Sequence, residues 1–145
     1  MKMSINLKEI NRIVIKVGSS TLTGKAGANL DPKAIDDLVD VVAKLKQDNK
    51  EVIVVSSGAI AAGLAPLGLS ARPSDLTSQQ AAASVGQGLL MAKYTQSFNR
   101  FEITTAQILI TLEDITKDAH IANIKGVLSS LLKQGVVPVI NENDT

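Results

Sequence analysis

A lysine and a run of small hydroxyl residues near the N-terminus are the first candidates for chemistry in this sequence. Lys16 lies in the β-branched run 13–17, and Gly18, Ser19 and Ser20 follow that run directly. A buried strand that ends in such a loop brings together an ammonium group, hydroxyls and backbone N–H groups, which suits a phosphoryl group. The alternative is an ordinary turn beside an edge lysine whose ammonium extends to water.

A second polar stretch follows the next apolar run. Residues 51–55 are Glu-Val-Ile-Val-Val, as expected of a strand covered on both faces, and Ser56, Ser57 and Gly58 come next. Because ligands of open parallel sheets bind beyond the carboxyl ends of the strands, we expect this stretch and residues 18–20 to share one crevice. Alternatively, Gly58 only allows a tight turn and Ser57 caps a helix.

Two carboxamides and two carboxylates follow the last apolar run, residues 136–140. They are Asn141, Glu142, Asn143 and Asp144. One interpretation is recognition of an amino group with Asp144 as counter-ion, or help in holding a metal-bound phosphate. The other is a plain turn, since Asn and Asp are common turn formers.

Helix signals separate these strands. Asp31 and Pro32 provide an N-cap and a first-turn proline, and the apolar stripe after them predicts a helix to about Gln47. Residues 103–110 predict a third strand, and residues 121–132 a further helix.

A long helix is expected between the second and third strands. Ser74 or Thr77 is predicted to cap it, and it runs to about Asn99. Glycines on this helix would allow close packing. The residues expected on its packed side are Ala82, Val85, Leu89 and Ala92, together with the glycines Gly86 and Gly88.

The order of elements predicts the fold class. The 145 residues are enough for one domain, with a loop expected at residues 24–29 after the first strand. Strand, helix and strand in alternation imply parallel strands with right-handed crossovers. We therefore expect an α/β fold, a three-layer αβα sandwich around a mainly parallel sheet.

Composition excludes several classes of function. With only 2% aromatic residues among 45% hydrophobic ones, the core must be aliphatic and rich in small residues. The net charge is +1, without a basic stripe, so neither nucleic acid nor a membrane is an expected partner. The absence of cysteine excludes disulfides and a cysteine nucleophile. Without a signal peptide or spanning segment, a soluble cytoplasmic protein is expected.

Known nucleotide and metal motifs do not match. Five residues, not four, separate Gly18 from Gly24, and Ala26 follows Lys25 where a P-loop has Ser or Thr. The dinucleotide fingerprint G-x-G-x-x-G is also missing after the first strand. His120, the only histidine, has no partner at metal-ligand spacing, so no metal site is predicted.

Taken together, four sequence blocks resemble the N-terminal part of the glutamate 5-kinases, in the amino-acid kinase family. They are Ile-Lys-Val-Gly-Ser-Ser-Thr-Leu-Thr at 15–23, Val-Val-Ser-Ser-Gly-Ala-Ile-Ala-Ala-Gly at 54–63, Gln-Ala-Ala-Ala-Ser-Val-Gly-Gln at 80–87, and Val-Pro-Val-Ile-Asn-Glu-Asn-Asp at 137–144. The blocks stand in the family's order and at its spacing. The second and fourth are the most specific.

The resemblance implies an ATP- and Mg²⁺-dependent phosphotransferase. Such an enzyme moves the γ-phosphoryl of ATP to the side-chain carboxylate of L-glutamate, giving L-glutamyl 5-phosphate for proline synthesis. Lys16 matches the family's phosphoryl-contacting lysine, and Gly18 and Ser19 would offer backbone donors to the phosphoryl. The implied glutamate contacts are Ser57, Gly58, Asn141 and Asp144, with Asp144 facing the α-amino group.

The resemblance also implies what this stretch lacks. Residues 1–145 correspond to the substrate-side part of the kinase domain, so the nucleotide-binding half and any C-terminal domain would lie outside them. The isolated chain is then expected to be inactive. The full-length enzyme would be a homo-oligomer, with proline as a feedback inhibitor.

Two alternatives remain open at this point. The chain could belong to another amino-acid kinase, such as an acetylglutamate kinase or an aspartokinase. It could instead act as a non-catalytic module that binds glutamate or proline without turnover.

Overall fold

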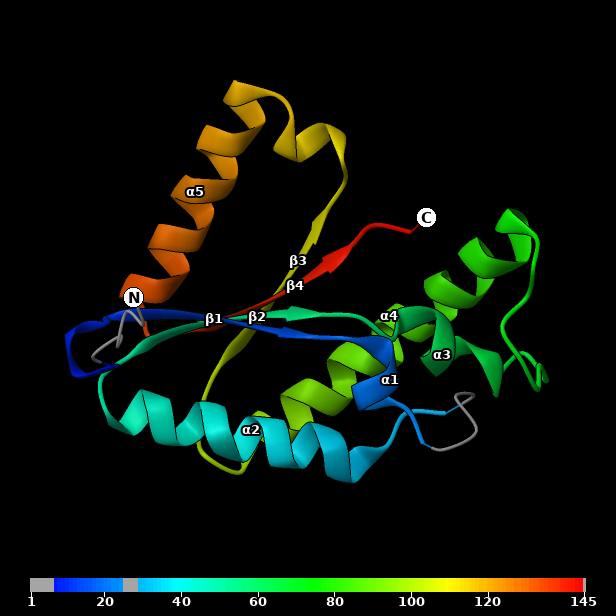
Figure 1. Cartoon of the computed structure of the whole chain (residues 1–145), viewed down its shortest axis with the longest axis horizontal. Coiled ribbons are helices and arrows are strands. Elements are labelled where there is room, and N and C mark those ends of the chain that lie inside the picture. Colours follow the sequence, from blue (N-terminus) through cyan, green and yellow to red (C-terminus); the bar gives the residue numbers. More distant parts are fainter. Residues whose placement is uncertain (1–6, 25–28, 145) are drawn as a thin grey trace, which may run out of the picture.

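The computed structural model describes residues 7–24 and 29–144, so the central part of the loop expected at 24–29 lies outside the described residues. Within them, the chain forms a sheet of four parallel strands in the spatial order β1-β2-β4-β3 (Figure 1). The strands are β1 (Arg12–Val17), β2 (Glu51–Ser56), β3 (Thr105–Ile110) and β4 (Val137–Glu142). The parallel sheet predicted from the apolar runs is confirmed.

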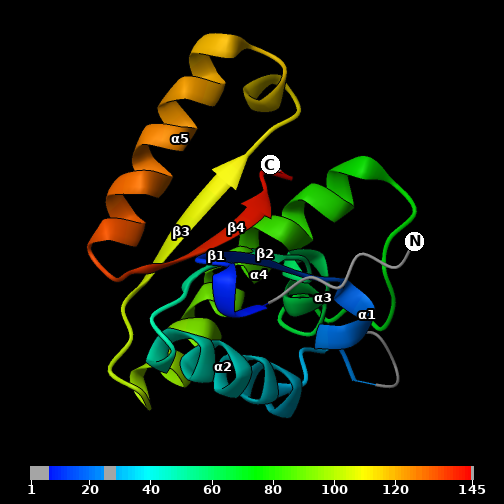
Figure 2. The same ribbon diagram turned by 60° about the vertical axis from the view of Figure 1, so that its left-hand side comes forward.

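Helices cover both faces of the sheet. They are α1 (Ser19–Leu22), α2 (Pro32–Gln47), α3 (Ala59–Leu64), α4 (Leu76–Asn99) and α5 (Asp118–Lys133), with 3₁₀ turns η1 (Leu7–Glu9) and η2 (Glu113–Ile115). The chain crosses the sheet in one direction from β1 to β3 and returns from β3 to β4. Right-handed crossovers therefore place α2 and α4 on one face and α5 on the other (Figures 1 and 2). The expected αβα sandwich is confirmed.

The main core lies between the sheet and the pair α2 and α4. Tyr94 and Phe98 are completely buried there and stack with their ring centroids 6.4 Å apart. A smaller core lies under α5, where Ile53, Leu132 and Ile140 are buried. Successive residues of each strand point to opposite faces, so every strand contributes to both sides of the sheet.

Two glycines determine how α3 crosses α4. A Cβ on Gly86 would lie 1.7 Å from the carbonyl oxygen of Ala59, and one on Gly63 would lie 1.9 Å from that of Ala82. The backbones of the two helices therefore touch at this crossing. The close packing expected at Gly86 is confirmed, but the same expectation for Gly88 is wrong, because a Cβ there would meet nothing within 4 Å.

The start and the buried side of α4 differ from the prediction. Its N-cap is neither Ser74 nor Thr77 but Asp75, whose side chain accepts a hydrogen bond from the Ser78 N–H at 2.8 Å. Of the four residues expected to be packed, only Ala82 is buried, while Val85, Leu89 and Ala92 are exposed. The buried side comprises Ala82, Ala83, Gly86, Leu90, Tyr94, Ser97 and Phe98.

Other boundaries follow the sequence closely. α2 begins at Pro32, and Asp31 caps it by accepting from the Lys33 N–H at 2.9 Å, as predicted. β4 is longer than the expected run 136–140, since Asn141 and Glu142 still pair with β3. These two residues are thus part of the sheet and not of a turn after it.

Candidate functional site

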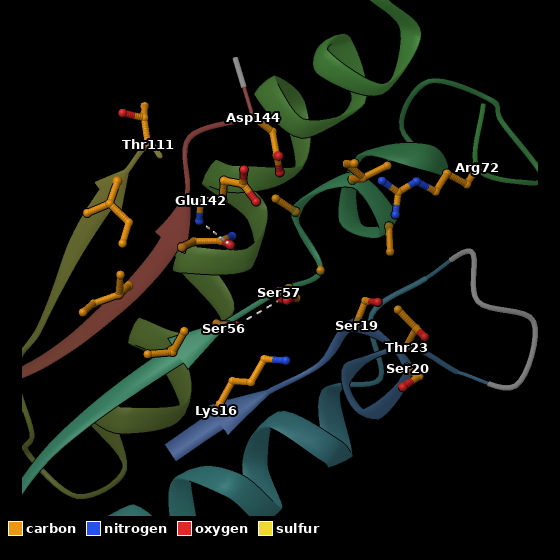
Figure 3. A pocket seen from close by; sticks show the side chains of 18 of the residues that line it. Lys16, Ser19, Ser20, Thr23, Ser56, Ser57, Arg72, Thr111, Glu142 and Asp144 are labelled. Atoms are coloured by element: carbon orange, nitrogen blue, oxygen red, sulfur yellow. Dashed lines mark hydrogen bonds between the residues drawn. The ribbon is translucent and has the colours of Figure 1, made fainter. Parts of the chain in front are cut away.

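A cavity of about 710 Å³ opens at the carboxyl ends of the strands (Figure 3). Residues from the loops after all four strands line it, together with the loop before α4. The crevice expected from the first two loops is therefore present. Its polar lining residues are Lys16, Ser19, Ser20, Thr23, Ser56, Ser57, Arg72, Thr111, Asn141, Glu142 and Asp144.

Lys16 lies at the base of this cavity, on the α5 face of the sheet. The sheet register places it beside Val55, and Val55 beside Ile140, so its neighbours in the sheet are apolar. Within the described residues the Lys16 ammonium has no ion-pair or hydrogen-bond partner, and the side chain points into the cavity (Figure 3). An exposed ammonium beside apolar strands is available to an anionic ligand.

The segment after β1, which includes the short helix α1, supplies hydroxyl groups to the same cavity. Ser19, Ser20 and Thr23 line the cavity. Gly18 does not line it; this glycine is the residue before α1, and its carbonyl accepts from the Thr21 N–H at 3.1 Å. Of the predicted phosphate-contacting residues, Lys16 and Ser19 are thus brought together in the cavity.

A buried hydroxyl chain holds the loop after β2. The hydroxyls of Ser56 and Tyr94 are 2.8 Å apart, and the Ser56 hydroxyl also donates to the Ser57 carbonyl at 3.0 Å. The Tyr94 hydroxyl is then the donor to Ser56. Burial raises the pKa of Tyr94 above its ordinary value, so this donor keeps its proton. These two hydrogen bonds connect the Ser57 backbone to Tyr94, in the middle of α4.

Gly58 turns the chain from β2 into α3. Its φ of +106° is a conformation that favours glycine, and it forms the N-cap of α3 without a side-chain hydrogen bond. The alternative in which Ser57 caps this helix is therefore wrong. Both Ser57 and Gly58 line the cavity.

The end of β4 is tied to α4 through Asn141. Its side-chain amide donates to the Gln87 side-chain oxygen at 2.8 Å, and its own oxygen accepts from the Glu142 N–H at 2.9 Å. These two bonds determine the orientation of the amide. Gln87 Nε2 is buried without a hydrogen-bond partner within the described residues. Asn141 itself is 6% exposed and contributes to the cavity lining.

Charge is divided between the walls of the cavity. Glu142 and Asp144 bring two carboxylates from the end of β4, and Arg72 brings a cation from the loop before α4 (Figure 3). With Lys16, these are the charged side chains of the described lining. The cavity therefore offers partners for both charges of a zwitterionic ligand.

The turn after β3 forms a further part of the rim. The Asp114 carboxylate accepts from the Thr111 N–H at 2.7 Å and from the Thr111 hydroxyl at 2.8 Å, and His120 Nδ1 lies 3.2 Å from it. The Thr111 hydrogen bonds, and then His120, lower the pKa of Asp114 below its ordinary value. His120 thus has a carboxylate partner, which sequence spacing did not indicate.

These residues fit a phosphoryl group better than a resident metal. Lys16 provides a cation, and three nearby side chains provide hydroxyl donors. Within residues 7–24 and 29–144, no three His, Asp or Glu side chains are grouped as a metal site. No described helix is long and apolar enough to cross a bilayer.

Several residues that line or support the cavity were not predicted from the sequence. Arg72 lies in an irregular connector, and Thr111 follows β3 without a recognisable motif. Tyr94 is in the middle of a long helix, and its contact with Ser56 spans 38 residues. The one available signal was the position of Thr111 directly after a predicted strand.

Comparison with known proteins identifies the family of this chain. A family model described as the amino acid kinase family matches residues 11–145. Glutamate 5-kinase of Streptomyces coelicolor is 58% identical over 137 residues, covering 94% of this chain and 36% of that protein. Glutamate 5-kinase of Thermobifida fusca is 53% identical over 139 residues, 96% of this chain and 36% of that protein.

A more distant relative matches a region of similar length. Glutamate 5-kinase of Citrifermentans bemidjiense is 47% identical over 139 residues, covering 96% of this chain and 37% of its own length. The chain thus spans a little over a third of the curated relatives that it matches. Because the family model covers all but the first ten residues, the chain belongs to the amino acid kinase family.

Proposed function

We propose that this chain forms the substrate side of a glutamate 5-kinase. The reaction transfers the γ-phosphoryl of ATP to the side-chain carboxylate of L-glutamate and yields L-glutamyl 5-phosphate. The observation that carries the proposal is the convergence of Lys16, Ser57 and Asp144, from three different strand ends, on one cavity. The identity to the glutamate 5-kinases supports this choice within the family.

The chemistry of the reaction suits this lining. A carboxylate is already a nucleophile, so the reaction needs no general base; the difficulty is to bring two anions together while charge spreads over the phosphoryl oxygens. The Lys16 ammonium and the hydroxyl and backbone N–H of Ser19 would stabilise that charge. ATP, with Mg²⁺, supplies the phosphoryl group when bound.

The opposite wall would bind the amino acid. Asp144 is the proposed partner of the α-ammonium group, and Ser57 and Gly58 border the same space. Asn141 keeps one N–H and one lone pair beyond its two hydrogen bonds, so it can add a contact to the substrate. The Gln87 contact would keep that amide oriented.

The nucleotide pocket is proposed to lie outside these residues. The relatives are nearly three times as long as the region they share with this chain. Within the described residues, the cavity offers Lys16 as a cation for the transferred phosphoryl group. We therefore infer that the remaining part of a full-length kinase would hold the nucleotide.

Isothermal titration calorimetry tests the proposal directly. The chain is titrated with L-glutamate, N-acetyl-L-glutamate and L-proline, and then with Mg-ATP. We expect L-glutamate to bind in preference to N-acetyl-L-glutamate, because the acetylated nitrogen has no charge to pair with Asp144. Competition by L-proline would place the inhibitor in the same cavity.

Two substitutions make the test specific. Asp144→Asn should weaken glutamate binding, while Lys16→Ala should leave most of that binding and, in a catalytically active enzyme form, abolish most turnover. Preference for N-acetyl-L-glutamate would point instead to an acetylglutamate kinase. Failure of a cooperatively folded chain to bind any of these amino acids would contradict the proposed substrate side.

A further inference from the structure

Of the two cationic side chains in the described lining, Arg72 is the one to which the proposed reaction assigns no role. It lies in the connector between α3 and α4, and its side chain extends toward the cavity (Figure 3). We propose that Arg72 binds the α-carboxylate of the amino-acid substrate and so determines the preference for α-amino acids over simple amines. This inference rests on the proposed glutamate kinase function.

The arginine is oriented by a short chain of hydrogen bonds. Its Nη2 donates to Gln79 Oε1 at 3.0 Å, and Gln79 Nε2 donates to the Pro73 carbonyl at 2.8 Å. Gln79 belongs to the first turns of α4, which Asp75 caps. Gln79 thus connects the end of the connector, at Arg72 and Pro73, to a long helix.

Most of the guanidinium remains available to a ligand. A guanidinium has five N–H donors, and the hydrogen bond to Gln79 uses one of them. The remaining donors can form the paired hydrogen bonds that a carboxylate accepts. Because the side chain is already held in place, less conformational entropy is lost on binding.

The charged groups of the described lining leave one cation, Arg72, for the α-carboxylate of L-glutamate. The substrate has two carboxylates and one ammonium group, and the described lining has two cations and two carboxylates. Lys16 is assigned to the phosphoryl group at the reacting end, and Asp144 to the ammonium group. The α-carboxylate then lacks a cation unless Arg72 supplies it.

Position supports this pairing. The α-ammonium and α-carboxylate are attached to the same carbon, so their partners must border the same part of the cavity. In Figure 3, Asp144 and Arg72 border the upper part of the cavity, and Lys16 rises from its lower part. Arg72 is therefore placed with the amino-acid end of the substrate and Lys16 with the reacting end.

The test compares L-glutamate with 4-aminobutyrate, which is glutamate without its α-carboxylate. Calorimetric titrations would use the unsubstituted chain, Arg72→Ala, Arg72→Lys and the control Lys125→Ala, which removes a charge from α5 away from the cavity. Arg72→Ala should lower the affinity for glutamate about tenfold or more and change that for 4-aminobutyrate less than about twofold. The affinity of Arg72→Lys for glutamate should lie between those of the unsubstituted chain and Arg72→Ala, because lysine keeps the charge but cannot form the paired hydrogen bonds.

Each other outcome counts against the proposal. Equal losses for both ligands would mean that Arg72 only shapes the connector. A loss confined to binding of inorganic phosphate, titrated in parallel, would assign Arg72 to the phosphoryl group. If Arg72→Ala leaves glutamate binding unchanged, the proposed role of Arg72 is wrong and the proposed function still stands. Absence of glutamate binding by the unsubstituted, cooperatively folded chain overturns the proposed function as well.

Discussion

On the α2 and α4 face of the sheet, Val54 of β2 is completely buried, as are the two stacked aromatic rings of α4. On the α5 face, Val14 of the neighbouring strand β1 remains 58% exposed. Leu132 is the one residue of α5 that is buried. The same residue type on adjacent strands thus has two environments. The first face supplies most of the hydrophobic stabilisation of the described fold.

The difference between the faces also explains where the cavity lies. Lys16 projects on the thinly covered face, where the exposed end of the sheet leaves room for a ligand. The loop at Ser57 is instead fixed from the densely packed face through Tyr94. A rigid support on one side and an accessible cation on the other are both useful in a binding site.

The largest effect on this comparison should come from Gly86→Ala. The new methyl group would overlap the Ala59 carbonyl, so α3 and α4 must separate and the densely packed face must open. We expect a loss of about 3 kcal/mol in the free energy of unfolding, measured by urea denaturation.

Gly88→Ala is the matched control on the same helix. Its Cβ would meet nothing within 4 Å, so the improved helix propensity should stabilise the chain by up to about 1 kcal/mol. Equal shifts of the urea midpoint for the two variants would show that the α3–α4 crossing is not as close as described.

Val54→Ala and Val14→Ala compare the two faces with one chemical change. Both remove the same two methyl groups and the same strand preference, so the difference isolates burial. We expect Val54→Ala to cost about 2 kcal/mol and Val14→Ala less than about 0.5 kcal/mol, again from urea denaturation. Similar losses would imply that the α5 face is covered in solution.

Tyr94→Phe tests the connection between the faces and the cavity. The lost hydroxyl should cost about 1 kcal/mol, because Ser56 then lacks its buried donor. Ser56→Ala should cost a similar amount. In a double-mutant cycle the two losses should not add, whereas full additivity would mean that the hydroxyls do not interact.

The smallest effect should be a loss of stability in acid. Hydrogen bonds from Ser78 lower the pKa of Asp75 below its ordinary value of 3.8. Because the folded-state pKa is the lower one, the stabilisation is present above about pH 4 and is lost as the pH falls through the folded-state pKa. In thermal melts between about pH 5 and pH 3, the melting temperature should decrease less for Asp75→Asn than for the unsubstituted chain, because Asn can still cap α4 and does not titrate. A parallel decrease in both proteins would contradict this role.

Local signals explain which elements could be predicted. Asp31 defines the start of α2, before Pro32, through its own hydrogen bond. Apolar runs, broken in β1 by Lys16, identify β1 and β2. The packed side of α4 could not be predicted, since small and apolar residues lie all around this helix. Its orientation depends on the contact of Gly86 with α3, which is distant in sequence.

The sequence by itself determined the order of the elements, the parallel sheet and the strand ends that border the cavity. These depend on local patterns and on the rule that parallel strands end at one edge. Only the tertiary structure placed Arg72 in the cavity, joined Tyr94 to Ser56 and extended β4 through Glu142. Each of these depends on a contact between segments far apart in the chain, and such contacts have no local signature.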